Sequence, residues 1–480
     1  MIALVLAGGR GNRFWPKSSP DLPKQFLTLG DSKSLLQKTV ERLWKLVQTD
    51  DIYIVIPEKY KEQVKMQLPE MDEKNLIIEP VTKDTAVAIG YASMVIAERY
   101  ETDPVMVVVP SDHLIDNEEN WVNTLKQAVQ LTNDVEVVTV GITPTRPETE
   151  YGYIILGKKA DKKTCAYFVK RFIEKPQKSK AESLLKSGNC LWNSGMFIWK
   201  LSTLRSLVKK YLPELYTALE KIKNFQHEKG CGTDLNTYMK ELFASIPAIS
   251  IDYGIVEKCR NIIVVEGNFS WDDLGDWRAL KRNGLCRTDN VLSVNSSGCI
   301  VDWDRGPVMV IGVDNLVIAG SDDGLLVCAE DMLNQIKKVL NSEEFLNITT
   351  HLKKRRRDEY KNSGTMIEKP WGREIIWAQT QNYAAKILIV APGEATSVHL
   401  HKEKEETFYI ESGTGFILLG EEVIPVKPGK VIHVKPNVSH RIMASEELVL
   451  FEVSTSHLDD VIRLNDRYGR EKKEGGWIKE

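Results

Sequence analysis

Several features are absent from this chain of 480 residues, and each absence excludes a class of protein. The 7 cysteines are odd in number and include no CxxC pair, which argues against a disulfide framework and a zinc-cysteine site and favours a reducing compartment. No run of about 18 apolar residues occurs, and the apolar N-terminal stretch is too short for a signal peptide. The formal net charge is only −3, so neither nucleic acid nor an anionic membrane is expected as a partner. We therefore expect a cytoplasmic protein.

The first part of the chain alternates strand-like and helix-like segments. Strands are predicted at residues 2–6, 52–56, 76–78, 105–109 and 135–140, and helices at residues 34–47, 86–99 and 121–131. Such alternation predicts an α/β fold in which helices cover both faces of a mostly parallel sheet. Ligands of these sheets bind at the carboxyl ends of the strands.

A chain of this length is expected to form two or three domains, and the sequence pattern changes along it. Residues 1–285 carry the α/β pattern. Residues 286–350 contain short β-rich runs and a helix expected at 332–340, which predicts a small all-β unit for packing or oligomerisation. The polar segment 351–364 carries a basic run and is predicted to be a solvated linker. Alternating strands in residues 365–480 predict an antiparallel barrel or sandwich.

A glycine-rich turn follows the first strand and is typical of a phosphate cradle. Gly8, Gly9 and Gly11 let the backbone turn sharply with its N–H groups pointing inward. The turn is neither a Rossmann fingerprint, because Phe14 replaces the third glycine, nor a Walker A motif, because no Gly-Lys-Ser/Thr ends it. Cations at the same mouth suit a ligand with several phosphates: Arg10, Arg13 and Lys24. The alternative is a plain strand–helix turn with solvated cations.

Two carboxylates are candidates for binding a hard divalent cation beside this turn. Asp112 follows a strand-like run, so its side chain emerges at the carboxyl end of that strand. Asp273 is favoured as the second carboxylate, and Asp272 competes with it. Each acid alone could be a loop or capping residue. Together with a phosphate cradle they predict magnesium-assisted nucleotidyl transfer, because Mg²⁺ prefers a few carboxylates plus phosphate oxygens.

The stretch LVLAGGRGNRFWPKS, with PKQFL shortly after it, resembles the signature of sugar-1-phosphate nucleotidyltransferases of the mannose-1-phosphate guanylyltransferase branch. Similar motifs follow along the chain: EPVTKDTAVAIG, PSDHLI, PETEYGYI, FIEKP, WNSGMF, SIPAISIDYGIVEK and SWDDLGDW. The C-terminal EKPWGREI and DVIRLNDRYGRE resemble the second half of the bifunctional (type II) enzymes, which join this transferase to a mannose-6-phosphate isomerase.

This resemblance implies a Rossmann-like nucleotidyltransferase domain, a β-helix-like unit and a C-terminal cupin barrel, in a homodimer or higher oligomer. The implied reaction converts GTP and mannose 1-phosphate to GDP-mannose and pyrophosphate. Catalysis is assigned to Arg13, Lys24, Asp112 and Asp273, with the two acids as Mg²⁺ ligands. Nucleotide binding is assigned to Leu6, Gly8, Gly9, Gly11, Asn12, Glu79 and Thr85, and sugar-phosphate binding to Tyr151, Gly152, Glu174, Lys175 and Asn193.

The chemistry of several of these residues fits the implied roles. Glu79 can accept paired hydrogen bonds from guanine N1–H and the exocyclic amine, a donor pair that uracil and thymine lack. A helix-flanking surface glutamate is the alternative for this residue. Lys175 would pair with the sugar phosphate, Glu174 would accept hydrogen bonds from sugar hydroxyls, and Tyr151 would help to close the sugar pocket.

The C-terminal segment carries two motifs that resemble the metal motifs of cupins. His399 and His401 fall on one face of a strand by the period of two, and Glu406 and His440 can complete a site of three histidines and one carboxylate. These ligand types do not separate Zn, Fe, Mn, Co and Ni. A lone histidine is more often structural, but four of the chain's eight lie between residues 399 and 440: His399, His401, His433 and His440.

Five positions depart from the resembled pattern, one of them conservatively, since His399 replaces a glutamine ligand. Glu150 stands where relatives commonly have glycine, and Asp84 where they have asparagine. In the cupin segment, Lys404 replaces an arginine and Thr407 a histidine thought to serve the substrate phosphate or proton transfer. Lysine lacks the planar fork of arginine, and threonine cannot act as a base near neutral pH. Isomerisation of mannose 6-phosphate to fructose 6-phosphate therefore stays open, beside a purely structural or regulatory cupin and a catalytically silent sugar-nucleotide-binding regulator.

Overall fold

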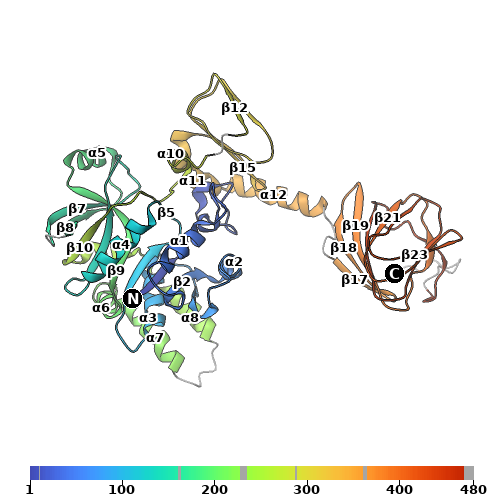
Figure 1. Ribbon diagram of the computed structural model, residues 1–480, viewed down its shortest axis with the longest axis horizontal. Helices are drawn as coiled ribbons and strands as arrows, with labels where there is room; N and C mark the ends of the chain where they lie inside the picture. The colour runs from blue at the N-terminus through green and yellow to red at the C-terminus, as the bar shows by residue number, and fades with distance from the viewer. Residues whose placement is uncertain (10, 161–163, 228–234, 287–288, 360–364, 470–480) are drawn as a thin grey trace. The chain divides into compact units, whose positions relative to one another are not determined.

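A computed structural model describes residues 1–9, 11–160, 164–227, 235–286, 289–359 and 365–469. The chain forms two compact units, Met1–Val339 and Leu340–Glu480, which Figure 1 shows in blue to yellow and in orange to red. Arg10, which the sequence places in the phosphate cradle, lies outside the described residues.

Unit 1 is built on a nine-stranded sheet with the order β3-β2-β1-β4-β9-β6-β10-β8-β7 (Figure 1). Its strands are β1 (Ile2–Leu6), β2 (Ile52–Pro57), β3 (Leu76–Glu79), β4 (Val105–Pro110), β6 (Val137–Ile142), β7 (Tyr153–Lys159), β8 (Ala166–Ile173), β9 (Cys190–Lys200) and β10 (Ile262–Gly267). β1 pairs in parallel with β2 and β4, and β6 pairs in parallel with β10, as the alternating pattern predicts. A separate two-stranded ribbon consists of β5 (Leu114–Ile115) and β11 (Trp271–Asp272).

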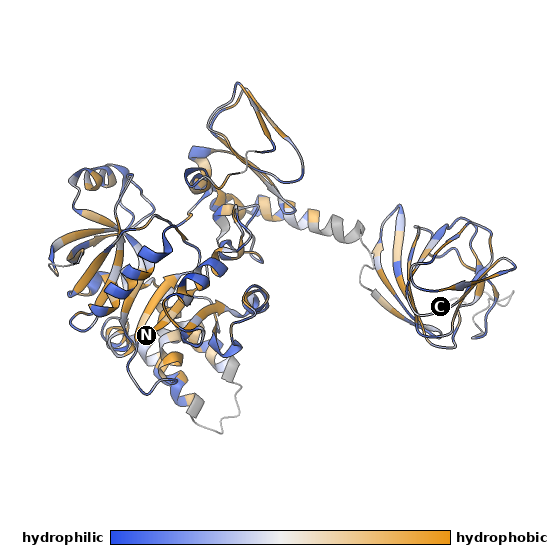
Figure 2. Cartoon of the chain, in the orientation of Figure 1, coloured by the Kyte–Doolittle hydropathy of each residue, from blue (hydrophilic) through white to orange (hydrophobic). Residues whose placement is uncertain are grey.

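Helices cover both faces of this sheet and bury an apolar cluster on each. Figure 2 shows the apolar strands inside unit 1. The helices are α1 (Leu35–Trp44), α2 (Lys61–Gln67), α3 (Thr85–Ala97), α4 (Glu118–Gln130), α5 (Lys178–Ser187), α6 (Leu201–Tyr211), α7 (Pro213–His227), α8 (Leu235–Ser245), α9 (Ile251–Gly254) and α10 (Trp277–Arg282). Short 3₁₀ helices are η1 (Asn12–Phe14), η2 (Lys24–Phe26), η3 (Thr49–Asp51), η4 (Glu58–Tyr60), η5 (Glu73–Asn75) and η6 (Val256–Lys258).

Strand β9 contains a polar stretch, Trp192 to Gly195, that the sequence pattern does not mark as a strand. The stretch lies within β9, which pairs antiparallel with both β4 and β6 at the centre of the sheet. A register shift opposite Thr139 accommodates it, and the Ser194 hydroxyl donates to the carbonyl of Val140 at 2.6 Å. Because its buried hydroxyl has a partner, this polar segment can occupy a central strand.

The last part of unit 1 is a coil of short strands in which each strand pairs in parallel with the next but one. β12 pairs with β14 and β13 with β15, while β16 folds back antiparallel on β15. This alternation between two sheets is the winding of a β-helix. The elements are β12 (Val291–Val294), β13 (Ile300–Asp302), β14 (Val308–Ile311), β15 (Leu316–Ser321), β16 (Gly324–Ala329), η7 (Glu330–Gln335) and α11 (Ile336–Leu340).

Unit 2 begins with a helix where a solvated linker was predicted. Helix α12 spans Glu343–Glu359 and contains the basic run, while residues 360–364 of the predicted linker lie outside the described residues. Glu343 and Glu344 in its first turn suit the helix dipole, and lysine, arginine and glutamate are good helix formers.

Two antiparallel sheets complete unit 2 and enclose one apolar core, as the alternating pattern predicts. The six-stranded sheet has the order β17-β18-β19-β26-β21-β24 and the five-stranded sheet the order β23-β22-β25-β20-β27. The strands are β17 (Thr365–Lys369), β18 (Gly372–Gln379), β19 (Tyr383–Val390), β20 (Val398–Leu400), β21 (Glu406–Ser412), β22 (Gly415–Leu419), β23 (Glu422–Val426), β24 (Val431–Val434), β25 (His440–Ala444), β26 (Leu448–Thr455) and β27 (Ile462–Asn465).

Candidate active site and metal centre

The glycine-rich turn after β1 is held by contacts from the segment that follows it. The Gln25 side-chain amide donates to the carbonyl oxygen of Ala7 at 2.7 Å and to that of Gly9 at 3.2 Å. Gly11 has a φ of +54°, and a Cβ atom there would lie 2.5 Å from the backbone nitrogen of Lys24. Only glycine fits this position, so the turn and the Lys24 segment pack directly against each other.

Other predicted nucleotide-binding residues lie along the same turn. Leu6 ends β1, and its carbonyl accepts a hydrogen bond from the Ser111 N–H at 3.1 Å, which ties β1 to the end of β4. Asn12 and Arg13 belong to η1, directly after the turn. The Arg13 side chain is 49% exposed and pairs with Glu150, with 3.5 Å between Nη1 and Oε2.

Lys24 joins the turn to the two candidate metal ligands. Its ammonium nitrogen lies 2.9 Å from Oδ2 of Asp112 and donates a hydrogen bond to the backbone carbonyl of Asp273. Burial opposes ionisation of Asp112, but the Lys24 ammonium outweighs it, so the pKa of Asp112 lies below its ordinary value. Asp112 is therefore a carboxylate at neutral pH.

The ribbon of β5 and β11 brings the two acids together from distant parts of the chain. Between these strands the Trp271 indole N–H donates to Nδ1 of His113 at 3.1 Å. This bond suits a neutral imidazole, and burial lowers the pKa of His113 to about 4. Because His113 directly follows Asp112 and Trp271 lies two residues before Asp273, the ribbon sets both acids around Lys24.

The contacts of Asp272 and Asp273 separate these two competing acids. The buried Asp272 carboxylate accepts two hydrogen bonds from Arg282, at 2.7 and 2.9 Å, and lies 3.5 Å from Arg146. Asp273 accepts a hydrogen bond from the Tyr151 hydroxyl at 2.8 Å, and burial raises its pKa. Asp272 is thus the counter-ion of two arginines, which favours Asp273 as a metal ligand.

Four residues predicted to bind the sugar phosphate lie together. The Asn193 N–H donates to the Gly152 carbonyl at 2.8 Å, and a Cβ atom on Gly152 would clash with Oε2 of Glu174. Lys175 follows with its ammonium 3.9 Å from the Glu174 carboxylate and its side chain 58% exposed. A side chain at Gly152 would therefore displace the Glu174 carboxylate, and a largely exposed lysine can meet an anion.

Asp252 is an acidic residue of this group that the sequence analysis did not select. Its Oδ1 accepts a hydrogen bond from the Asn193 amide at 2.7 Å, which fixes the orientation of that amide. Burial, together with the nearby Asp252 carboxylate, raises the pKa of Glu174 to about 7. The preceding Ile251 N–H donates to the Thr85 hydroxyl at 2.9 Å. Through α9, a predicted nucleotide-binding residue is thus linked to a predicted sugar-binding residue.

Glu79 ends β3 as a buried carboxylate whose side chain borders the glycine-rich turn, since a Cβ atom on Gly8 would lie 3.2 Å from Oε2. Oε1 is buried and has no hydrogen-bond partner among the described residues, and burial raises the Glu79 pKa to about 7. Such an orphaned acceptor next to the turn suits a ligand that donates hydrogen bonds. Asp84, which departs from the resembled pattern, caps α3 by accepting from the Thr85 N–H at 2.7 Å.

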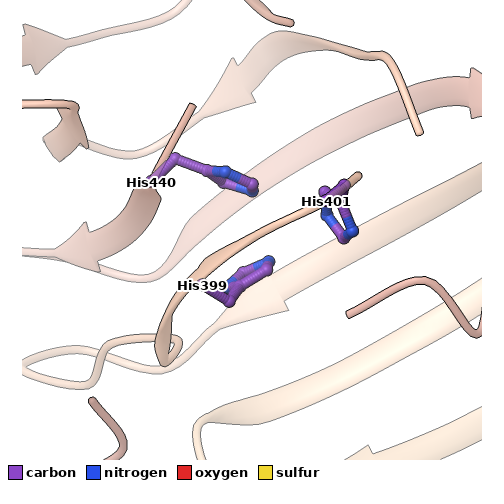
Figure 3. Close-up of side chains that lie close together, drawn as sticks. All are labelled: His399, His401 and His440. Atoms are coloured by element: carbon purple, nitrogen blue, oxygen red, sulfur yellow. The ribbon is translucent and has the colours of Figure 1, made fainter. Parts of the chain in front are cut away.

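Three histidines converge inside unit 2, where Figure 3 shows their rings turned towards one another. The ligand atoms of His399, His401 and His440 all lie within 4.8 Å of each other. In each ring Nδ1 faces a backbone carbonyl oxygen, that of Ser397, Asp460 or Val438. A carbonyl can only accept, so Nδ1 carries the proton and Nε2 is free to bind a metal.

Glu406 completes this group from β21. Its Oε2 lies 3.3 Å from Nε2 of His401 and 3.0 Å from Nε2 of His440, yet within the described part of the chain none of these three buried atoms makes a hydrogen bond. Acceptor atoms that face one another in this way are typical of ligands around a cation. The other oxygen of Glu406 pairs with the buried Lys404, which also lies 2.7 Å from Glu452.

The two unusual positions of the cupin segment lie in different places. Lys404 lines a cavity of about 170 Å³ that also holds the three histidines. Thr407 is not part of that cavity lining, and its hydroxyl contacts the exposed His433 at 3.0 Å. Lys404 therefore forms part of the cavity wall, whereas Thr407 lies outside the cavity.

Three family models match successive parts of the chain. The nucleotidyl transferase model matches residues 2–285, the MannoseP isomerase/GMP-like beta-helix domain model residues 289–342, and the cupin domain model residues 386–454. These matches confirm the predicted fold class: a nucleotidyltransferase domain, a β-helix-like unit and a cupin barrel, in that order.

Relatives match over nearly their whole length. The mannose-1-phosphate guanylyltransferase of Klebsiella pneumoniae is 34% identical, with 98% of this chain and 100% of that protein covered. The protein of the same name from Escherichia coli is 33% identical with the same coverage. This chain belongs to the mannose-1-phosphate guanylyltransferase family. A crystal structure described as mannose-1-phosphate geranyltransferase from Thermus thermophilus is 35% identical with a TM-score of 0.61, and covers 71% of this chain and 98% of that one.

Some polar residues of this guanylyltransferase-family site carried no sequence signal of their own. They are Gln25, Arg146, Asp252 and Arg282, and each contacts a predicted site residue or its backbone rather than open solvent. Neither spacing nor charge marks such residues, and only motif membership could have pointed to two of them, PKQFL for Gln25 and SIPAISIDYGIVEK for Asp252. Among the described helices of this family member, none is long and apolar enough to cross a membrane.

Proposed function

We propose that the chain transfers GMP from GTP to mannose 1-phosphate and so forms GDP-mannose and pyrophosphate. One observation carries this proposal: the buried Lys24 ammonium lies between Asp112 and Asp273, directly beside the glycine-rich turn. The turn offers backbone N–H groups to a triphosphate, and Tyr151 connects Asp273 to the strand segment that holds Gly152. Two phosphate-bearing substrates can therefore meet at Lys24.

The reaction needs positioning and charge neutralisation rather than a side-chain nucleophile. An oxygen of the mannose phosphate attacks the α-phosphorus of GTP, and a new P–O bond forms in line with the bond that breaks. The electron pair of the broken bond leaves with pyrophosphate. Lys24 would neutralise charge on the reacting phosphates, and Arg13, at the mouth of the turn, charge on the leaving group.

Asp112 and Asp273 fit a magnesium ion, because both are carboxylates from separate segments that Lys24 joins beside a phosphate cradle, through the Asp112 carboxylate and the Asp273 backbone. When bound, Mg²⁺ would neutralise phosphate charge and orient the two substrates. The ionised state of Asp112 prepares it for this role. Asp273 has a raised pKa, so a cation at this position would favour its ionised form.

Recognition of the two substrates would fall to opposite sides of Lys24. The free oxygen of Glu79 would accept hydrogen bonds from the guanine N1–H and amine. Glu174 and the oriented Asn193 amide would bind mannose hydroxyls, while Lys175 would pair with the mannose phosphate. Thr85 would contact the nucleotide at the start of α3.

Pyrophosphate release tests this proposal. Each of GTP, ATP, UTP, CTP and dTTP would be offered with mannose 1-phosphate and with glucose 1-phosphate in the presence of Mg²⁺. We expect the fastest release with GTP and mannose 1-phosphate, and a loss of at least about 100-fold in Lys24→Ala and Asp112→Asn. Equal rates with all triphosphates would contradict the guanine assignment, and release that survives Lys24→Ala would contradict the assigned centre.

For unit 2 we infer a divalent transition metal, one of Zn, Fe, Mn, Co and Ni, held by His399, His401, His440 and Glu406. The orphaned ring nitrogens and carboxylate oxygen support this inference, since a cation would satisfy all of them at once. The metal would act as a Lewis acid in the cavity.

Interconversion of mannose 6-phosphate and fructose 6-phosphate is a second candidate function. It is favoured by the position of Thr407 outside the cavity, because the loss of a histidine there removes no group from the cavity wall. A coupled assay of the full chain with fructose 6-phosphate and each divalent metal tests it. Turnover that His440→Ala abolishes would support isomerase activity. If no metal gives turnover, guanylyltransferase activity would be the only proposed activity that remains.

A further inference from the structure

We infer that Tyr151 is a positioning residue for the metal-binding carboxylate of Asp273, and that it does not contact the sugar. This inference rests on the proposed function, in which Asp273 holds a divalent cation. The family resemblance implies a place for Tyr151 in the sugar pocket. Its contacts in the structure point instead to the metal side of the site.

The Tyr151 hydroxyl is directed at Asp273. It donates a hydrogen bond to Oδ1 of Asp273 at 2.8 Å, the length of a good O–H···O bond. A phenol carries its proton near neutral pH, so the hydroxyl is the donor and the carboxylate oxygen the acceptor. A bond to one carboxylate oxygen leaves the other oxygen to face a cation.

The ring of Tyr151 is packed on its sides and has little surface left for a sugar. The residue is 5% exposed and belongs to the apolar core of one sheet face. Its ring meets Trp192 and Trp271 edge-on, with centroid distances of 5.2 and 5.1 Å. Because Trp271 begins β11, the ring also packs against the strand that contains Asp272 and leads into Asp273.

Arg146 donates a hydrogen bond to the hydroxyl oxygen of Tyr151. Its Nη2 donates to the Tyr151 oxygen at 3.2 Å, while its Nε pairs with Glu148 at 3.1 Å. A cation that donates to the phenol oxygen polarises the O–H group and strengthens the bond that the hydroxyl donates to Asp273. Arg146 also contacts Asp272, so the whole group holds the segment of both acids in one orientation.

A group that orients a metal ligand in this way changes metal affinity by about 10- to 100-fold when it is removed. We therefore expect Tyr151→Phe to weaken binding of a divalent cation by about that factor. The KM for mannose 1-phosphate should stay close to the wild-type value at saturating metal, because the ring has no sugar contact. A sugar contact would give the opposite pattern, a raised KM for mannose 1-phosphate with unchanged metal affinity.

The chain offers a matched control in Tyr153. This residue is fully buried two positions further along, and its hydroxyl donates to the backbone carbonyl of Glu148 at 2.9 Å rather than to a carboxylate. Tyr153→Phe removes the same atom from a buried ring of the same region. Any loss of divalent-cation affinity that Tyr151→Phe causes through packing or general destabilisation should also appear in Tyr153→Phe.

The experiment measures Mn²⁺ binding by electron paramagnetic resonance in the full chain with guanosine 5′-[α,β-methylene]triphosphate, and the Mg²⁺ and mannose 1-phosphate dependence of pyrophosphate release. The variants are Tyr151→Phe, Tyr153→Phe and Asp273→Asn. Weaker Mn²⁺ binding in Tyr151→Phe and Asp273→Asn, with wild-type binding in Tyr153→Phe, supports the inference. Wild-type Mn²⁺ binding in Tyr151→Phe overturns it while Asp273→Asn still loses the ion. Wild-type binding in Asp273→Asn as well would instead refute the metal site of the proposed function.

Discussion

Arg13 and Glu150 form an ion pair, 3.5 Å from Nη1 to Oε2, between the glycine-rich turn and the loop that leads into Tyr151. Both side chains are about half exposed, at 49% and 55% for Arg13 and Glu150. An arginine proposed to neutralise the triphosphate is therefore already partnered by a carboxylate. A triphosphate that engages Arg13 has to compete with Glu150.

Replacing Glu150 by glutamine should strengthen GTP binding. An exposed ion pair contributes about 0.2–1 kcal/mol, so we expect the KM for GTP to fall by up to about fivefold with little change in kcat. Steady-state kinetics at low ionic strength would measure this difference, and added salt should narrow it because salt screens exposed charges. An unchanged KM at low salt would show that the pair does not compete with the triphosphate.

Replacing Gly11 by alanine should damage both the fold and the activity. A Cβ atom there would lie 2.5 Å from the Lys24 nitrogen, at a φ of +54° that costs a non-glycine residue about 1–3 kcal/mol. We expect a lower Tm and at least a tenfold loss in kcat/KM, roughly what such strain would produce. Gly9→Ala is the matched control, since a Cβ atom at that position would have no atom of the described residues within 4 Å. Equal losses of Tm in both variants would contradict this account.

Binding of GTP should weaken as the pH falls through about 7. The Glu79 pKa is raised to about 7 by burial, and only its ionised form accepts both guanine donors. The ionised fraction falls about tenfold from pH 8 to pH 6, so the KM for GTP should rise by about that factor over this range. Glu79→Gln should bind GTP more weakly at pH 8 and lose this pH dependence. A wild-type KM that does not change with pH would contradict the assignment of Glu79.

The ionisation of Glu79 also predicts a trend in stability. A carboxyl group whose folded pKa exceeds its unfolded value makes the folded state less stable as pH rises through the interval between the two values. The contribution of Glu79 to the free energy of unfolding should therefore fall between its ordinary pKa of 4.5 and about 7. Urea denaturation of wild type and Glu79→Gln across this range would measure the difference.

Purified protein should contain about one transition metal ion per chain, and His440→Ala should lose it. Guanylyltransferase activity should persist in that variant, because unit 1 carries its own site. His433→Ala is the control, since this exposed histidine pairs with Glu405 at 2.9 Å outside the group of three. Metal analysis by mass spectrometry would decide, and equal metal content in His440→Ala and wild type would contradict the assigned ligands.

Much of the fold could be predicted because its signals are local. The buried apolar run of β1, the capping residue Ser34 before α1 and the period-two histidines are each signals within a few neighbouring positions of the sequence. Strand β9 was missed because its polar residues are satisfied by a bond to Val140 and a register shift, and neither can be seen before β6 is in place.

The site was only partly predictable for a related reason. Asp112 and Lys24 could be selected because each lies beside a recognisable strand or motif. The choice between Asp272 and Asp273 depended on Arg146 and Arg282, which reach Asp272 from other segments. A side chain that acts by orienting another side chain leaves no pattern in the sequence. Tyr151 is the clearest case, because its hydroxyl contacts Asp273 while its ring packs against two tryptophans.

The ribbon of β5 and β11 determines when the active site can form during synthesis. Asp112 and the glycine-rich turn leave the ribosome early, but the strand that pairs with β5 begins only at Trp271. Domains fold as their chain emerges, and pairing between distant segments comes late. A nascent chain shorter than this point holds a phosphate cradle without its second acid. The enzyme can therefore become active only once the chain has been synthesised past Asp273 and the domain is complete.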